Sequence, residues 1–257
     1  MSDSESDSDA QPLPAIHAAV RNLDVEALRR ALAAGANVDA IDESGRTPLY
    51  VACKARPPPS VVTMAPPIWR EKVREREAIV AALLRAGANV NARCGMYPTV
   101  DLTPLMAAVY DRDFPPSSIV AQLMAAGAEI EATDDHGFFV LYTAARNACA
   151  DTVARLIAAG ANVHRRLRVP KYTAMEGATL TRNVRAYAPL LRAGATLPPI
   201  SRRNAYLRKI AATPGGYRAY ERAHRARLAA IFIPKFPGLP VEVIHHIVSI
   251  WADCGGH

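Results

Sequence analysis

The stretch DTVARLIAAGANV at residues 151–163 decides the fold, because near copies of it stand at residues 25–38 and 77–90. In each copy a segment rich in Ala, Leu and Val runs into a Gly-Ala pair. Glycine tolerates the left-handed conformation that follows a helix end, so each copy predicts a short helix closed by its glycine. Two further Gly-Ala pairs, at Gly127 and Gly194, continue the series with a period of 33 and 34 residues. This regular spacing predicts a stack of helical repeats.

A second, shorter helix is predicted upstream of each closing glycine. It opens most clearly with TPLY at residues 47–50 and with TPLM at residues 103–106. Threonine can cap a helix N-terminus, and proline at the first helical position has no amide hydrogen to leave unsatisfied. A related opening stands at residues 14–17, and those at 139–142 and 173–176 are degenerate. The chain is therefore predicted to consist of paired helices separated by polar turns.

The distance from each opening to its closing glycine sets the repeat boundaries. It is 21 residues in repeats one, four and five, but 40 in repeat two (47 to 87) and 24 in repeat three (103 to 127). Repeat two thus carries an insertion near residues 56–74, and repeat three carries a short one at Pro115-Pro116. Prolines mark both insertions, so we expect each to bulge between the two helices of its repeat. The predicted repeats are residues 14–46, 47–102, 103–138, 139–172 and 173–197.

Residues 14–197 resemble the ankyrin-repeat family in these openings, in the Gly-Ala closures and in the repeat length. The resemblance implies a curved stack of helix pairs with hairpin fingers on one side, and it implies that the stack binds other proteins. The predicted fold class is therefore all-α, an ankyrin-repeat α-solenoid of about five repeats followed by a small helical C-terminal segment. Repeat four departs from the pattern at Phe138-Phe139, which we interpret as local core filling. An exposed aromatic contact on a finger is the alternative.

Target binding is expected on the fingers and on the concave helix face, spread over several repeats. The finger candidates are Ile41, Asp42, Glu43, Arg46, Asp134, Asp135, His136, Phe138, Arg165, Arg166 and Arg168. The concave-face candidates are Arg21, Lys54, Tyr110 and Arg146. The expected partner is one or more target proteins, and the sequence does not name them.

Charge is distributed unevenly along the chain, whose formal net charge is +7. Residues 1–12 form an acidic tail that we expect to be disordered. Residues 165–227 carry 15 lysines and arginines against two acids, and residues 198–238 are predicted to form a basic helical linker. A solvated basic face explains this excess, and an acidic protein partner or a nucleic-acid surface is the alternative. Because no nucleic-acid-binding motif accompanies the charge, we do not expect nucleic acid as a partner.

Several classes of function are not expected from the sequence. The four cysteines, Cys53, Cys94, Cys149 and Cys254, lie far apart, which argues against a zinc site or a disulfide framework. This favours a reducing compartment, the cytoplasm or nucleus, of a host cell if the source is a virus. No apolar run approaches the roughly 18 residues of a membrane span. No phosphate-binding loop, nucleophile elbow or metal-ligand cluster stands in the sequence, so we expect a monomer without catalytic activity, metal or cofactor.

The C-terminal stretch LPVEVIHHIVSIW at residues 239–251 predicts a helix with one apolar face. Its proline suits a first helical turn, and its glutamate suits the positive end of the helix dipole. The stretch resembles the first helix of an F-box, and its position after the array is similar to the truncated F-box, or PRANC, of poxviral and other large-virus ankyrin proteins. The resemblance implies recruitment of a cullin–RING ubiquitin ligase through a Skp-type linker. The residues carried over as linker contacts are Leu239, Pro240, Glu242, Val243, Ile244 and Ile247.

These observations predict an adaptor that holds a target on its repeats and recruits a ligase through residues 239–257. A SOCS box is a rival interpretation, but residues 217–233 lack the cysteine that its upstream helix needs. The other alternative is an ankyrin scaffold or inhibitor without a ligase, in which the C-terminal helix is a structural cap on the last repeat. Exposure of residues 239–251 discriminates between adaptor and cap.

Overall fold

The computed structural model describes residues 15–54, 66–95, 101–110, 117–199 and 204–253, which are helical apart from loops and two isolated β-bridges. Three features of the sequence lie outside the described residues. They are the predicted acidic tail at 1–12, the prolines at 57–59 and the prolines at 115–116.

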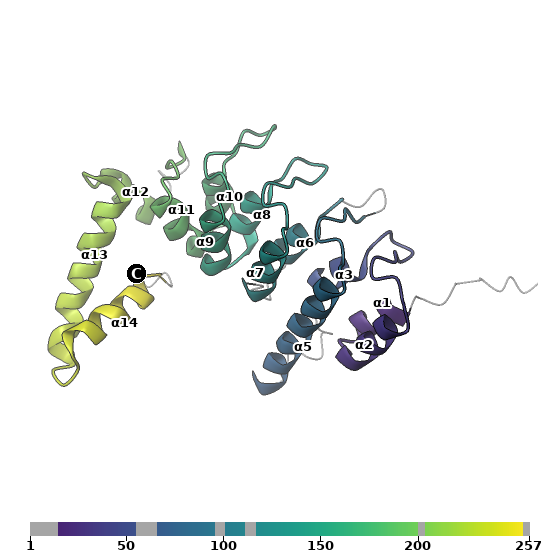
Figure 1. The fold of residues 1–257 in the computed structure, drawn as a ribbon. Coiled ribbons are helices and arrows are strands. Elements are labelled where there is room, and N and C mark those ends of the chain that lie inside the picture. The colour runs from purple at the N-terminus through teal and green to yellow at the C-terminus, as the bar shows by residue number, and fades with distance from the viewer. Residues whose placement is uncertain (1–14, 55–65, 96–100, 111–116, 200–203, 254–257) are drawn as a thin grey trace, which may run out of the picture.

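The helices form two layers of a repeat stack, which Figure 1 shows from α1 and α2 at one end to α10 and α11. The first layer consists of α1 (Ala15–Arg21), α3 (Pro48–Lys54), α6 (Pro104–Tyr110), α8 (Val140–Asn147) and α10 (Ala174–Leu180). The second consists of α2 (Val25–Ala33), α5 (Pro66–Arg85), α7 (Ser117–Ala125), α9 (Ala150–Ala158), and η1 (Val184–Ala186) with α11 (Tyr187–Arg192). Hairpin loops between repeats project on one side of the stack (Figure 1). The predicted all-α solenoid is therefore confirmed.

The core of the stack uses the same positions in every helix pair. An apolar side chain is buried two residues after each opening and seven residues before each closing glycine. The first set is Ile16, Leu49, Leu105, Leu141 and Met175, and the second is Leu28, Val80, Val120, Val153 and Tyr187. The five closing glycines all have positive φ, between +82° and +97°, as a left-handed helix end requires. Because neighbouring pairs share these positions, the core is continuous through the stack.

Repeat five keeps its helix start although its opening is degenerate. The Glu176 carboxylate accepts a hydrogen bond from the Thr173 backbone N–H at 2.6 Å, and Thr173 Oγ1 accepts one from the Glu176 N–H. This capping box replaces the missing proline as the device that begins α10. The next residue, Gly177, lies against α8, where a Cβ would come within 2.8 Å of Tyr142 Cε2. Glycine is therefore what lets α10 and α8 approach each other here.

The insertion in repeat two differs from the expectation. Residues 66–74 do not bulge but belong to α5, which begins at Pro66. The two prolines are tolerated because they occupy the first turn, where no N–H partner is needed. Arg76, buried on the same helix, donates a hydrogen bond from Nε to the Ala52 carbonyl at 2.8 Å and another to the Cys53 carbonyl. These bonds satisfy carbonyls at the end of α3 and hold the long helix on the stack.

The C-terminal segment consists of α12 (Ala205–Ala212), α13 (Gly216–Phe232), η3 (Ile233–Lys235) and α14 (Val241–Asp253). Buried Leu207 and Ile210 join α12 to the core of the stack. The Glu221 carboxylate of α13 accepts hydrogen bonds from Arg192 of α11, one of them at 2.8 Å. Figure 1 shows α13 leaving the stack and α14 folding back beside it. The predicted basic helical linker is thus the element that covers repeat five.

Candidate functional site

Four hairpin fingers connect consecutive repeats, and one backbone hydrogen bond closes each of them at an equivalent place. The N–H donors are Asp42, Cys94, Asp134 and Leu167, and the respective acceptors are the carbonyls of Arg46, Leu102, Phe138 and Tyr172, at 2.9–3.0 Å. We call the donor the anchor residue and number the fingers 1 to 4 in chain order. All four anchor side chains are buried. Fingers 1 and 3 bury a carboxylate there, whereas finger 2 buries a thiol and finger 4 a leucine.

The anchor of finger 1, Asp42, is the centre of an ion-pair network. Its carboxylate lies 2.9 Å from Arg21 Nη2 and 2.9 Å from Arg46 Nη2. It also accepts hydrogen bonds from the Ser44 and Arg46 backbone N–H groups, each at 3.0 Å. Burial alone would raise the pKa of Asp42, but the Arg46 side chain and these N–H groups outweigh it and lower the pKa to about 2. Asp42 therefore stays ionised and holds the finger in shape.

The anchor of finger 3, Asp134, has the same structural role with different donors. Its carboxylate accepts hydrogen bonds from the Phe138 N–H at 2.8 Å and from the Tyr110 hydroxyl at 3.1 Å. Burial, together with the charge of Asp134, raises the pKa of Tyr110 to about 12. Tyr110 thus remains a neutral donor that ties finger 3 to α6.

These contacts correct part of the predicted target-binding surface. Asp42 and Asp134 are each 5% exposed, so their carboxylates do not face a target, and the prediction is wrong for both. Arg46 and Tyr110 are half-buried and Arg21 is exposed, and all three donate to the two anchors. The sequence alone did not show this burial, because one donor to each aspartate, Arg21 or Tyr110, lies on a distant helix.

Other predicted target contacts do lie on the surface. They are Ile41, which is 66% exposed, and Glu43, Lys54, Asp135, His136, Arg166 and Arg168. Phe138 is half-buried, with its ring 5.3 Å from that of Tyr142 and the Arg146 guanidinium 6.0 Å from its centroid. Phe139 is buried, which confirms its interpretation as core filling. The exposed part of the predicted surface therefore lies on fingers 1, 3 and 4, with Lys54 at the end of α3.

Finger 4 differs from the others in its charge. Arg165 is fixed, because its guanidinium pairs with Glu131 and lies 5.0 Å from the centroid of the Phe139 ring. Arg166, Arg168 and Lys171 are exposed, and their charged groups have no hydrogen-bond or ion-pair partner among the described residues. Leu167 stands where fingers 1 and 3 have their aspartate. Finger 4 therefore carries three cations that pair with none of the described residues.

A pocket of about 240 Å³ lies between fingers 3 and 4. Its lining residues are Thr133, Asp134, Asp135, His136, Gly137, Arg165, Arg166 and Arg168. Finger 3 supplies the carboxylates and finger 4 supplies the guanidinium groups, so the two walls have opposite charge. Most of these residues were predicted as target contacts from the sequence, but their position around one pocket follows only from the stacking of the repeats.

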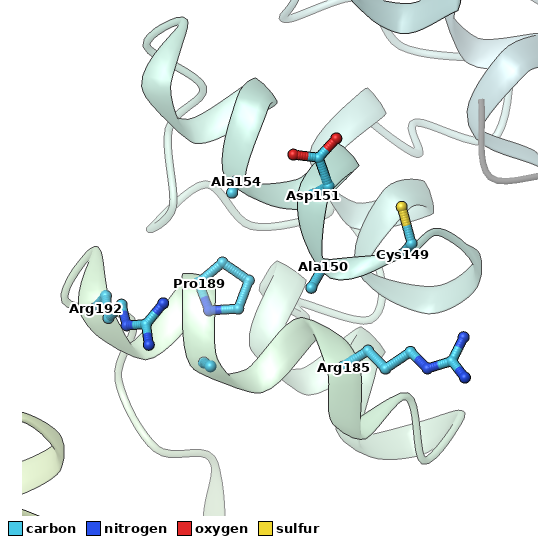
Figure 2. A pocket seen from close by; sticks show the side chains of 8 residues that line it. Cys149, Ala150, Asp151, Ala154, Arg185, Pro189 and Arg192 are labelled. Carbon is cyan, nitrogen blue, oxygen red and sulfur yellow. The ribbon is translucent and has the colours of Figure 1, made fainter. Parts of the chain in front are cut away.

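A larger pocket of about 500 Å³ lies between α9 and α11, on the layer of second helices. Figure 2 shows Cys149, Ala150 and Asp151 on one side of it and Arg185 and Pro189 on the other. Its ionic groups are engaged at two places, since Asp151 pairs with Arg155 at 2.8 Å and Arg192 pairs with Glu221. Small side chains in this part of the two helices account for the space. The residues do not form a catalytic arrangement.

The predicted linker-docking residues on and before α14 are divided between two faces. Leu239 is 42%, Val243 41% and Ile247 48% exposed, and Pro240 and Glu242 are exposed too. Ile244 is buried, because it packs with Val248 against Leu228 of α13. The prediction is therefore wrong for Ile244, which is not accessible to a partner. Val241 and Phe236, exposed beside the others, were missed because the F-box resemblance does not include them.

The described part of the chain has neither a metal-binding cluster nor a membrane-spanning helix. No group of three or more His, Cys, Asp or Glu residues there is arranged to hold a metal ion. No helix in the same residues combines the length and apolarity that crossing a membrane requires.

Residues 16–64 match a family model described as ankyrin repeats in many copies. No curated protein matches the chain. The described part of this match, residues 16–54, holds the helices of repeat one and the first helix of repeat two, and the later helix pairs repeat the same core positions and glycine closures. Ankyrin repeats imply protein–protein interaction, and proteins built from them are typically interaction scaffolds rather than enzymes. The fold is thus an all-α repeat solenoid, of which residues 16–64 match ankyrin repeats.

Proposed function

We propose that this protein is an adaptor whose repeats bind a target protein and whose helix α14 recruits a cullin–RING ubiquitin ligase through a Skp-type linker. The observation that supports the recruitment is the exposure of Leu239, Val243 and Ile247 beside the buried pair Ile244 and Val248. One face of α14 is used for packing, and the other presents apolar side chains to solvent. The proposal places the protein in the cytoplasm or nucleus, where such ligases act.

Exposed apolar side chains that cluster on one helix favour a docking role over a structural one. Single exposed leucines are common, whereas a contiguous group of them marks a surface that a partner covers. An amphipathic helix that lays such a face into a hydrophobic groove is a recurrent mode of recognition. Had α14 been a cap on repeat five, these side chains would be expected in the stack core, and instead the buried side of α14 meets α13.

A second candidate function is a scaffold or inhibitor that binds its target without a ligase. The burial of Ile244 favours it, because one of the six residues carried over from the F-box resemblance is used to hold α14 in place. In this reading the exposed apolar face of α14 belongs to the target-binding surface.

The test is a titration of the purified full-length protein with a purified Skp-type linker, followed by calorimetry. We expect binding that the double substitution Val243→Glu with Ile247→Glu weakens at least about tenfold, because two charges would enter an apolar groove. Ile41→Glu is the control, since it charges an exposed apolar side chain on finger 1, far from α14 in the sequence.

Absence of binding by the full-length protein, or equal binding by the double variant, would contradict the ligase proposal. The scaffold candidate would then stand, and its target would be sought with the repeats. Because the two substituted side chains are exposed, the helical circular dichroism of the variant should match that of the parent.

A further inference from the structure

The pocket between fingers 3 and 4 joins an acidic wall to a basic one. We propose that this pocket is a subsite for an anionic side chain of a bound protein segment, which pairs with Arg166 and Arg168 on the finger 4 wall. The inference deepens the proposed function, since it rests on the repeats holding a protein target, and it does not depend on α14.

The first argument is the state of the charges on finger 4. Arginines on the other fingers are already matched: Arg46 with Asp42 and Arg93 with Asp101, the latter pair at 3.5 Å. On finger 4 itself Arg165 is matched with Glu131. Arg166 and Arg168 keep their full donor capacity at the pocket. A guanidinium binds a carboxylate or phosphate through two parallel hydrogen bonds, so each of these two arginines can hold an anion.

The second argument is that the pocket walls are held in place. Arg165 is fixed by Glu131 and by the Phe139 ring, and the buried Leu167 anchors the segment between the two free arginines. On the opposite wall the Asp134 carboxylate is occupied by Tyr110 and Phe138, and Asp135 accepts a hydrogen bond from the Asp101 N–H at 3.2 Å. A ligand side chain would therefore meet a shaped site rather than mobile loops, which reduces the entropy lost on binding.

The third argument distinguishes a protein from a nucleic acid. A phosphate backbone needs a continuous positive surface, because its affinity comes from many phosphate contacts. The finger 3 wall places Asp134 and Asp135 at the same pocket, and their charges would repel successive phosphates. A single acidic side chain can contact finger 4 alone, and the neighbouring residues of a peptide can suit finger 3. The opposite charges of the two walls therefore favour a protein segment.

The experiment measures the binding of fluorescein-labelled peptides to the full-length protein by anisotropy. The peptides share one Gly/Ser/Leu background and carry glutamate, phosphoserine or glutamine at the same positions, and a single-stranded oligonucleotide is measured beside them. We expect the glutamate or phosphoserine peptide to bind at least about tenfold more tightly than the glutamine peptide. A preference between the two anionic peptides identifies the source of the anion as a carboxylate or a phosphate.

Substitutions locate the binding on the protein. Arg166→Glu with Arg168→Glu should weaken the anionic peptide at least about tenfold, because each removes a charge-assisted contact and adds repulsion. The matched control is Arg74→Glu with Arg85→Glu, which makes the same change in net charge at exposed arginines of α5. Asp135→Asn should strengthen binding, because it removes a negative charge from the facing wall.

Three results would overturn the inference. They are equal binding of the glutamine peptide, equal losses in the finger 4 and α5 variants, and tighter binding of the oligonucleotide than of any peptide. Failure of the ligase proposal is distinguishable, because Val243→Glu with Ile247→Glu should leave peptide binding unchanged. Conversely, the finger 4 variant should bind the Skp-type linker as the parent does.

Discussion

The repeat stack and the α13–α14 hairpin are both made of helices, but the stack has a much larger buried apolar core than the hairpin. The stack has one core that runs without interruption from Ile16 to Ile210. Among its described side chains, the hairpin has a separate cluster of three buried residues, Leu228, Ile244 and Val248, with Phe232 and Ile233 packed beside them. Because stability follows the apolar surface that is buried, most of the folding free energy lies in the stack. The hairpin can therefore open without unfolding the repeats.

This difference assigns separate tasks to the two regions. The stack keeps the fingers in register, since each finger is anchored by groups of the neighbouring repeat elements, such as Tyr110 with Asp134. The hairpin holds α14 on α13 through a small buried cluster and leaves apolar side chains on its outer face. A rigid surface suits target recognition, and a weakly held helix suits docking into the groove of a partner. The following predictions test this division, beginning with the largest effect.

Leu156→Ala should test the cooperativity of the stack. Leu156 is fully buried in α9, in the middle of the continuous core. The substitution leaves a cavity and should lower the free energy of unfolding by about 2–5 kcal/mol. Urea denaturation followed by circular dichroism measures the loss. A loss below about 1 kcal/mol would show that neighbouring side chains fill the cavity, and it would contradict the description of the stack as a tightly packed, continuous core.

Asp42→Asn should reveal how much a finger anchor contributes to the stack. The native pKa of about 2 lies below the ordinary value of 3.8, so the ionised form stabilises the fold at pH values above the ordinary pKa. This stabilisation is lost as the pH falls through the native pKa. The variant should be about 2 kcal/mol less stable at pH 7, and the difference should vanish near pH 2. Urea titrations at pH 7 and pH 2 measure it.

The control for these titrations is a carboxylate that does not anchor a finger. Glu43 is its exposed neighbour, and Glu43→Gln should change stability little at either pH. A difference for Asp42→Asn that persists unchanged at pH 2 would mean that the lost contacts are steric rather than ionic.

The parts of the fold that could be predicted are those set by local sequence. Glycine closures, Thr-Pro openings and apolar spacing depend on a few neighbouring residues, and the two helix layers followed from them. The role of Asp42 could not be read in this way, because its partner Arg21 lies on α1 and only the folded stack brings them together. A turn aspartate is ordinarily exposed, so the sequence indicated a surface contact.

Helix α5 and helix α14 show two further limits. Prolines such as those at 66 and 67 occur both in loops and at helix starts, so they did not predict the start of α5. The hydrogen bond from the buried Arg76 to the Ala52 carbonyl joins residues far apart in the sequence, so no local pattern predicts it. On α14 the apolar residues Val243, Ile244 and Ile247 are adjacent on the helix surface, so the spacing alone did not indicate which would face α13. The pocket between fingers 3 and 4 depends on the distance between two repeats, which the sequence does not contain.

Gly177→Ala should test the close contact between α8 and α10. The added Cβ would lie within 2.8 Å of the Tyr142 ring, which is itself buried and packed against Phe138 and Phe139. Overpacking costs about 1–3 kcal/mol, and alanine regains up to about 1 kcal/mol of helix propensity. We therefore expect a net loss of about 1 kcal/mol, measured by urea denaturation. Gly177→Ala combined with Tyr142→Leu should lose less than the sum of the single changes, because the smaller side chain makes room.

Ile244→Ala should separate the hairpin from the stack most clearly. Ile244 is as well buried as many stack residues, at 3% exposure, yet its neighbours are the few members of the small cluster. The substitution should change the global free energy of unfolding by less than about 0.5 kcal/mol, because the hairpin opens without the repeats. Hydrogen exchange should nonetheless become faster in residues 241–248 and stay unchanged in α6 and α8. Ile247→Ala is the matched control, since Ile247 is 48% exposed one turn away and should alter neither quantity. If Ile244→Ala lowered global stability as much as Leu156→Ala does, the hairpin would be part of the cooperative core, and the proposed division between rigid recognition and loosely held docking would have to be abandoned.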